Sequence, residues 1–376
     1  MSVYLDHAAS TPMREVAIEA MRPYLDATYA NPAGAHRFAR RARKAVDEAR
    51  DDIAQVIGCE PGEVIFTGGG TEADNATILG AVRKHGGVAV CSAAEHHAVL
   101  HCVEHTGGPI IGTTPTGAID LEHLERVLRD QSIDVSVVSV MAVNNEVGTI
   151  TPMRKVAALV REHRPNAILH CDAVQAACWL DLREISPLVD SIALSAHKFG
   201  GPKGVGVMTL RAGKSVEPLI FGGGQERDRR SGTHNVPGIV ATAAALRATD
   251  EERASEIARL GGLSKRLEQG IVERVGEVTV TVPAEHRVPG VVHLCFSGVE
   301  SEALLFLLDE ANVYASAASA CASGAMSPSH VLAAMGVSNS LIRGALRMSI
   351  GHTTTHDDID RAIDAVSSAV LRLRAR

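Results

Sequence analysis

Lys198 is the residue in this sequence whose position best suits covalent chemistry. It follows the apolar run SIALS, residues 191–195, and precedes a glycine-rich stretch. Open α/β sheets build their sites where strands end, and burial there favours the neutral amine of a lysine. A neutral amine can form a Schiff base with an aldehyde cofactor, and the flanking Ser195 and His197 can hold a phosphate. Alternatively, Lys198 is a surface lysine in a glycine loop.

A second apolar run ends in an acid. Asp172 follows ILHC, residues 168–171, and Gln175 lies three residues further on. A buried carboxylate needs a cationic partner, and a protonated pyridine nitrogen would serve. The alternative is that Asp172 caps the helix that follows.

Two glycine-rich stretches are candidate anion sites. In FTGGGTEADN, residues 66–75, Gly70 and Thr71 stand where a strand turns into a helix, and such a helix start favours phosphate. The stretch lacks both the P-loop pattern and a clean dinucleotide-binding pattern. In FGGGQERDRRSGTHN, residues 221–235, three arginines precede Thr233, which fits either an anion site or a solvated basic loop.

A histidine-rich stretch, AAEHHAVLHCVEH at residues 93–105, raises the question of a metal. His97 and His101 are four residues apart on an expected helix, a spacing that zinc sites use. The stretch is not an H-E-x-x-H motif, and no distant Cys or His pair completes it. His96, which follows an expected strand, would instead stack on a planar cofactor.

Two further polar residues fall at or on expected strands. Asn145 follows the apolar run at residues 135–141 and is either a polar ligand or part of an ordinary turn. Arg347 lies in LRMSI, residues 346–350, where a guanidinium either clamps a substrate carboxylate or forms a structural ion pair.

Cys321 stands in ASAASACASGAM, residues 315–326, among small side chains. Such a segment has few packing anchors, so we expect it to be mobile. A thiolate on a mobile segment is a candidate nucleophile.

Short apolar runs alternate with amphipathic helical stretches from residue 36 to about 260. This alternation predicts a mostly parallel sheet covered by helices on both faces. Beyond residue 260 the pattern changes to a smaller α+β lobe, which the N-terminal arm is expected to join. The length of 376 residues also favours two lobes over one.

Composition excludes several classes of protein. The net charge of −7 argues against a broad basic surface for nucleic acid. We expect no signal peptide, because the first residues lack a charged region followed by an apolar run. We expect no membrane span, because no apolar run reaches about 18–20 residues. The seven cysteines follow no framework spacing, which indicates reduced thiols in a cytoplasmic protein.

Taken in order, these motifs resemble the cysteine desulfurases, pyridoxal-phosphate enzymes of the class V aminotransferase group, in the branch with a long catalytic loop. The resemblance implies a pyridoxal-phosphate-dependent transferase-like α/β fold, fold type I of aspartate aminotransferase. The large domain, residues 15–258, would hold a mostly parallel seven-stranded sheet, and residues 1–14 and 259–376 would form the smaller α+β domain. The matching stretches are YLDHAASTP, NPAGAHRFAR, EVIFTGGGTEADN, EHHAVL, VNNEVGT, HCDAVQ, SAHKFGGPKGVG, GGGQERDRRSGT, SACASG and PSHVL.

The resemblance also implies roles for the cofactor ligands. Lys198 would form the Schiff base, Asp172 would pair with the pyridine nitrogen and Gln175 would bind the ring hydroxyl. His96 would stack on the ring and move protons. The phosphate would be held by Gly70, Thr71, Ser195 and His197, and by Thr233 from the other subunit of a homodimer.

The implied reaction converts L-cysteine to L-alanine. Asn145 and Arg347 would orient the substrate, and Cys321 would take its sulfur as a persulfide for an iron–sulfur scaffold or a tRNA-thiolation enzyme. Ala318 stands where the family has glycine, which predicts a less mobile loop. The alternatives are a selenocysteine lyase or another class V enzyme, a zinc-binding interaction protein and a nucleotide-binding dehydrogenase.

Overall fold

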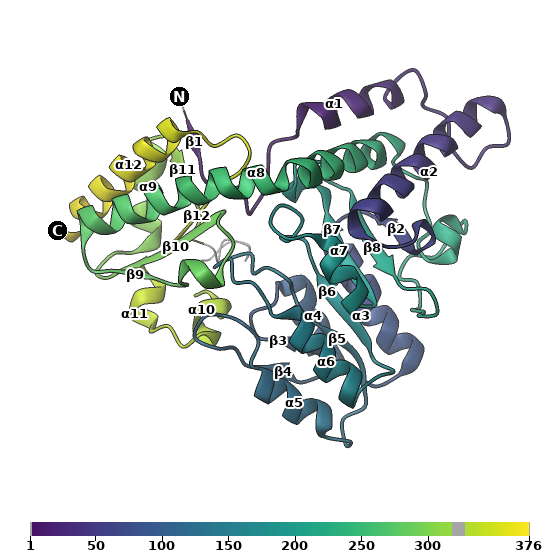
Figure 1. Ribbon diagram of the computed structural model, residues 1–376, viewed down its shortest axis with the longest axis horizontal. Coiled ribbons are helices and arrows are strands. Elements are labelled where there is room, and N and C mark those ends of the chain that lie inside the picture. The colour runs from purple at the N-terminus through teal and green to yellow at the C-terminus, as the bar shows by residue number, and fades with distance from the viewer. Residues whose placement is uncertain (1, 318–327, 376) are drawn as a thin grey trace.

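A seven-stranded sheet forms the centre of the larger lobe in this computed structural model, which describes residues 2–317 and 328–375 (Figure 1). The strands from β7 to β4 run parallel, and β8 is antiparallel to both of its neighbours. In spatial order the strands are β2 (Val64–Thr67), β8 (Gly206–Leu210), β7 (Ser191–Ser195), β6 (Ile168–Asp172), β5 (Val135–Ser139), β3 (Val88–Ser92) and β4 (Ile110–Ile111).

Helices cover both faces of this sheet, and neighbouring residues of one strand therefore pack into different cores. Val137 packs in a cluster with residues of α3 and α4, whereas Val138 packs on the other face with residues of α2, α5 and α6. The predicted mostly parallel sheet with two covered faces is therefore confirmed. The helices are α1 (Glu15–Met21), α2 (Arg37–Ile57), α3 (Gly70–His85), α4 (His97–Thr106), α5 (Leu121–Arg129), α6 (Met153–His163) and α7 (Leu182–Ile185).

The smaller lobe is built on an antiparallel sheet in the order β12–β10–β9. The N-terminal arm joins this lobe, since β1 pairs with β11 in parallel. The elements are β1 (Val3–Tyr4), β9 (Val278–Val280), β10 (Val291–Phe296), α9 (Ser301–Glu310), β11 (Val313–Tyr314), α10 (His330–Ala334), α11 (Asn339–Ile342), β12 (Ala345–Ser349) and α12 (His356–Arg374).

One helix, α8 (Val236–Val275), runs through both lobes (Figure 1). Its first half contributes Leu246 to the core of the large lobe, and its second half contributes Leu260 to the core of the small lobe. The sequence predicts only a separate helix after residue 260. The predicted domain boundary at residue 258 falls inside α8 and stays a prediction.

Short 3-10 helices link several of these elements. No helix in the described ranges is both long and apolar enough to span a membrane. Each cysteine within those ranges is a free thiol. The 3-10 helices are η1 (Arg22–Tyr24), η2 (Pro61–Glu63), η3 (Ser186–Leu188), η4 (Ala196–Lys198), η5 (Gln225–Asp228) and η6 (Ala284–His286).

Candidate active site

A cavity of about 780 Å³ opens where strands of the large sheet end. Asp172 is the last residue of β6 and Ser195 the last of β7, so both stand at the edge where parallel sheets build their sites. The volume of this cavity is typical of a pocket for a small molecule. The predicted site residues that line it are Gly70, Thr71, His96, Asn145, Asp172, Gln175, Ser195, His197, Lys198 and Arg347.

Lys198 points into this cavity from η4, half-buried, and is not a surface lysine in a loop. Its Nζ donates hydrogen bonds to the carbonyl oxygens of Ala8, at 2.6 Å, and Ala9, at 3.0 Å. The hydroxyl of Thr11 donates to the Lys198 carbonyl at 2.9 Å. The N-terminal arm thus fixes both ends of the lysine, and Gln175 donates to the same Ala8 oxygen at 2.7 Å.

Asp172 is 5% exposed, and its Oδ1 accepts a hydrogen bond from the backbone of Val174 at 2.9 Å. The carboxylate therefore caps a turn. The expected helix cap is wrong, because residues 174–179 form a turn and the next helix, α7, begins at Leu182 with Asp181 as its cap. Burial, together with the nearby Asp74, raises the pKa of Asp172 to about 7. A cation beside this carboxylate would offset the burial and favour its charged form.

Asp74 also lines the cavity and was not among the predicted site residues. It is 1% exposed, and burial raises its pKa to about 8. His170 Nε2 lies 3.1 Å from Asp74 Oδ1, and His170 Nδ1 lies 3.0 Å from the hydroxyl of Ser191. Asp74 follows Thr71 by three residues on α3, so helical spacing could have shown that both share a face.

The candidate phosphate end of the cavity lies at the start of α3. A side chain at Gly70 would meet Val174 Cγ2 at 2.6 Å, so only glycine fits here. The hydroxyl of Ser195 lies 3.0 Å from His197 Nδ1. Burial and the nearby Lys198 lower the pKa of His197 to about 4. Lys203 also lines the cavity, and its place in GGPKGVG was a signal that the sequence interpretation left unused.

His96 caps α4, where its Nδ1 accepts a hydrogen bond from the backbone of Ala98 at 3.1 Å. Burial and the charge of Lys198 lower the pKa of His96 to about 4. Its ring is therefore neutral at pH 7, and with Nδ1 accepting, the ring proton is on Nε2.

Two other histidines of this stretch, His97 and His101, form tilted ring contacts together with His330 of α10. The His97 centroid lies 4.9 Å from that of His101 and 4.4 Å from that of His330. Nowhere in the described chain do three or more His, Cys, Asp or Glu side chains converge as metal ligands would.

Arg347 is 5% exposed and forms contacts of two kinds. Its Nη2 pairs with Asp6 Oδ1 at 2.6 Å, and its Nη1 donates to the carbonyl oxygen of Asn145 at 2.9 Å. Its Nε is buried without a hydrogen-bond partner. The structural ion pair considered for Arg347 is therefore present, and the residue also lines the cavity.

The remaining two predicted site residues are Thr233 and Cys321. Thr233 is exposed and does not line the cavity of its own chain. Cys321 and Ala318 fall outside the described residues. Ser316, five residues before Cys321, exchanges backbone hydrogen bonds with Arg347, so the chain leading to the Cys321 segment passes beside the cavity.

Comparison with known proteins decides the family. The aminotransferase class-V model matches residues 3–362. The chain is 40% identical over 384 residues to an IscS-like cysteine desulfurase of Mycobacterium tuberculosis, covering 99% of this chain and 97% of that protein. The chain belongs to the cysteine desulfurases of this family.

Further relatives agree with this assignment. A cysteine desulfurase IscS of Dictyoglomus turgidum is 38% identical over 380 residues, covering 99% of this chain and 95% of that one. The solved structure of a NifS-like protein superposes with a TM-score of 0.91 at 32% identity, covering 98% and 99% of the two chains. The predicted family and fold class are thus confirmed.

Proposed function

We propose that this protein is a pyridoxal-phosphate-dependent cysteine desulfurase that converts L-cysteine to L-alanine and passes the sulfur through Cys321 to an acceptor protein. One observation carries the proposal. Lys198 and Asp172, from the ends of adjacent strands, line a single cavity together with His96. A reactive amine, a buried acid and a neutral imidazole around one small-molecule pocket suit chemistry on an amino acid.

The residues present fit pyridoxal phosphate. Asp172 is a buried carboxylate with a raised pKa, which a protonated ring nitrogen would return to its charged form. Gln175 and His96 line the ring region, and the start of α3 with Ser195 and His197 would hold the phosphate. When bound, the cofactor supplies an electron sink for the carbanion formed at the substrate Cα.

The side chains of the cavity then have distinct tasks. Lys198 would carry the cofactor and move the proton at Cα. His96, neutral at pH 7 with its proton on Nε2, would donate that proton toward the substrate and take it back afterwards. Arg347, already fixed by Asp6, would present its guanidinium to the substrate carboxylate, next to Asn145.

Cys321 would react as a thiolate and receive the sulfur of the substrate. Its Sγ forms an S–S bond with the sulfur of L-cysteine while the Cβ–S bond of the substrate breaks. Cβ takes the thiol proton, so the products are L-alanine and a Cys321 persulfide anion. Atoms and charge balance without an external oxidant.

Three further parts of the proposal concern the surroundings of the enzyme. A homodimer would bring Thr233 of one subunit to the phosphate site of the other, which fits the exposed position of Thr233. The sulfur acceptor would be an iron–sulfur scaffold or a tRNA-thiolation enzyme. We place the protein in the cytoplasm because persulfide transfer needs thiols that stay reduced.

The test is a single-turnover assay on protein loaded with pyridoxal phosphate. We expect L-cysteine to yield one L-alanine per persulfide, with the persulfide mapped to Cys321 by mass spectrometry. Cys321→Ser should form neither product, whereas Cys59→Ser, outside the cavity, should match the wild type. Alanine formation by Cys321→Ser would contradict the proposal, and activity of that variant on selenocysteine alone would indicate a selenocysteine lyase.

A further inference from the structure

The segment before Thr233, residues 225–232, contains an unusual backbone conformation. Glu226, Arg227 and Asp228 have φ values of 48°, 57° and 63°, in the left-handed region that disfavours residues with a Cβ. Glycine adopts this conformation without strain, and glycines stand directly before the segment at positions 222–224. Three strained residues in a row indicate that contacts of the segment with its surroundings hold this conformation.

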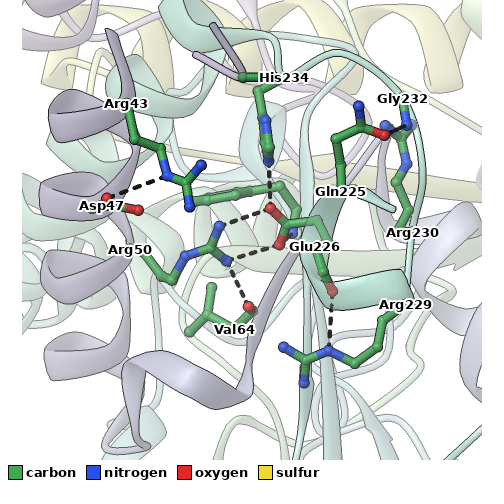
Figure 2. Close-up of polar contacts among 12 residues, drawn as sticks. Arg43, Asp47, Arg50, Val64, Gln225, Glu226, Arg229, Arg230, Gly232 and His234 are labelled. Carbon is green, nitrogen blue, oxygen red and sulfur yellow. Dashed lines mark hydrogen bonds and ion pairs between the residues drawn. The ribbon is translucent and has the colours of Figure 1, made fainter. Parts of the chain in front are cut away.

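Glu226 is the centre of this segment (Figure 2). Its side chain is buried. Arg50 donates two hydrogen bonds to the carboxylate, Nη1 to Oε2 at 2.8 Å and Nη2 to Oε1 at 2.7 Å. Oε2 also accepts from the backbone of Phe66 at 3.0 Å, and His234 Nε2 lies 2.6 Å from Oε1. Burial alone would raise the pKa of Glu226, but the hydrogen bonds from Arg50 and His234 outweigh it and lower the pKa to about 2.

Other side chains of the segment also form hydrogen bonds that fix its position. Arg227 Nη1 and Arg229 Nη2 each donate to the carbonyl oxygen of Gly62 at 2.8 Å. Gln225 Oε1 accepts a hydrogen bond from the backbone of Gly232 at 2.8 Å, which closes the segment into a loop (Figure 2). The segment is therefore anchored to α2 and to the chain leading into β2.

These contacts fix both sequence neighbours of Thr233. Gln225 holds Gly232 on one side, and Glu226 holds His234 on the other. Thr233 itself remains exposed and does not line the candidate active-site cavity in the described part of its own chain.

We propose that Glu226 and Gln225 are positioning residues that hold Thr233 outward for the phosphate site of a second copy of this chain. This role rests on the proposed function, since it assumes the cofactor and the dimer. Neither residue touches the cofactor; both act through the loop that they close. Replacing Glu226 should therefore weaken cofactor binding in the neighbouring subunit and leave its own site intact.

The proposal is tested with hybrid dimers made by co-expressing two differently tagged chains and purifying on both tags. In the first hybrid, one protomer carries Lys198→Ala and its partner carries Glu226→Gln. In the second, one protomer carries both substitutions and its partner is wild type. Each hybrid has one Lys198, so borohydride reduction after timed gel filtration, followed by mass spectrometry, counts pyridoxal phosphate at that single site.

We expect the second hybrid to lose cofactor at least roughly tenfold faster than the first, an effect of the size seen when groups that orient binding residues are removed. Thr233→Val should likewise speed cofactor loss only when it is carried by the protomer that has Lys198→Ala. Gln225→Ala should do so more weakly, and it guards against a Glu226 variant that folds poorly. Asp228→Asn removes a charge from the same turn at an exposed position. A hybrid with this substitution should lose cofactor no faster than a hybrid whose only substitution is Lys198→Ala in one protomer.

Each other result has a defined meaning. Faster loss in the first hybrid would assign Glu226 a structural role in its own site and overturn the proposal. Equal retention in both hybrids, with Thr233→Val still acting across the dimer, would overturn it while leaving the proposed function intact. If Thr233→Val acts within its own chain, the proposed dimer arrangement fails, and if Lys198 carries no pyridoxyl group in any sample, the proposed cofactor fails, each taking this proposal with it.

Discussion

Arg347 of β12, which lines the cavity, and Asp6 of the N-terminal arm form an ion pair at 2.6 Å, Nη2 to Oδ1. The two residues are far apart in sequence, and the pairing of β1 with β11 brings the arm into the small lobe. With Nη1 also bound to Asn145, the guanidinium is fixed and its Nε edge remains without a partner. A substrate carboxylate would meet a donor whose orientation is already set.

The first prediction concerns substrate affinity. Arg347→Lys should raise KM for L-cysteine by about 10–100-fold with a smaller change in kcat, because an ammonium cannot reproduce the planar guanidinium. Asp6→Asn keeps the guanidinium but weakens its anchor, so it should raise KM less. Steady-state kinetics on cofactor-loaded protein measure both, and an unchanged KM for Arg347→Lys would exclude a role in carboxylate binding.

The second prediction separates the two buried acids of the cavity. Asp172→Asn should lower kcat by roughly 10²–10³, since it removes the charge expected to hold a proton on the cofactor ring. Asp74→Asn should change kcat little, because the pKa of Asp74 is raised to about 8 and its carboxyl is largely neutral at pH 7. Equal losses in the two variants would show that Asp172 has no special partner.

The third prediction is a pH dependence of folding stability. Burial lowers the pKa of His293 to about 3, against about 6.5 for an unperturbed histidine. Between these values the unfolded chain binds a proton that the folded chain does not, so the free energy of unfolding falls as the pH falls. This one residue contributes up to about 1.4 kcal/mol per pH unit.

His293→Asn cannot titrate, so its free energy of unfolding should fall less steeply than that of the wild type between pH 6.5 and pH 4. Urea unfolding of the two proteins at several pH values measures the difference. His105→Asn, at an exposed position, is the control and should leave the slope unchanged. Parallel curves for His293→Asn and the wild type would mean that His293 is not titrating as its burial implies.

Much of the candidate site was predictable because it depends on side chains at strand ends. Asp172 and Ser195 each close an apolar run of residues that strands bury, and parallel strands bring such ends to one edge. The alternation of Val137 and Val138 between two cores follows from a pattern that the sequence shows directly. Local pattern and fold agree at these positions.

Other features depend on contacts that leave no mark on local sequence. The acceptors for Lys198 are the backbone oxygens of Ala8 and Ala9, which any residue type could provide. The stretch around Glu226 looks like a basic loop, yet its one buried acid organises it through Arg50, 176 residues away. The continuity of α8 across both lobes is set by packing in two separate cores.

The central claim is that Lys198 carries pyridoxal phosphate, and borohydride reduction tests it most directly. The purified protein should show an absorption band of the bound cofactor that L-cysteine perturbs and borohydride abolishes. Peptide mapping should then place one pyridoxyl group per chain on Lys198 and none on Lys203, the other lysine of the cavity. A pyridoxyl group on Lys203 instead, or on no residue at all, would contradict the account.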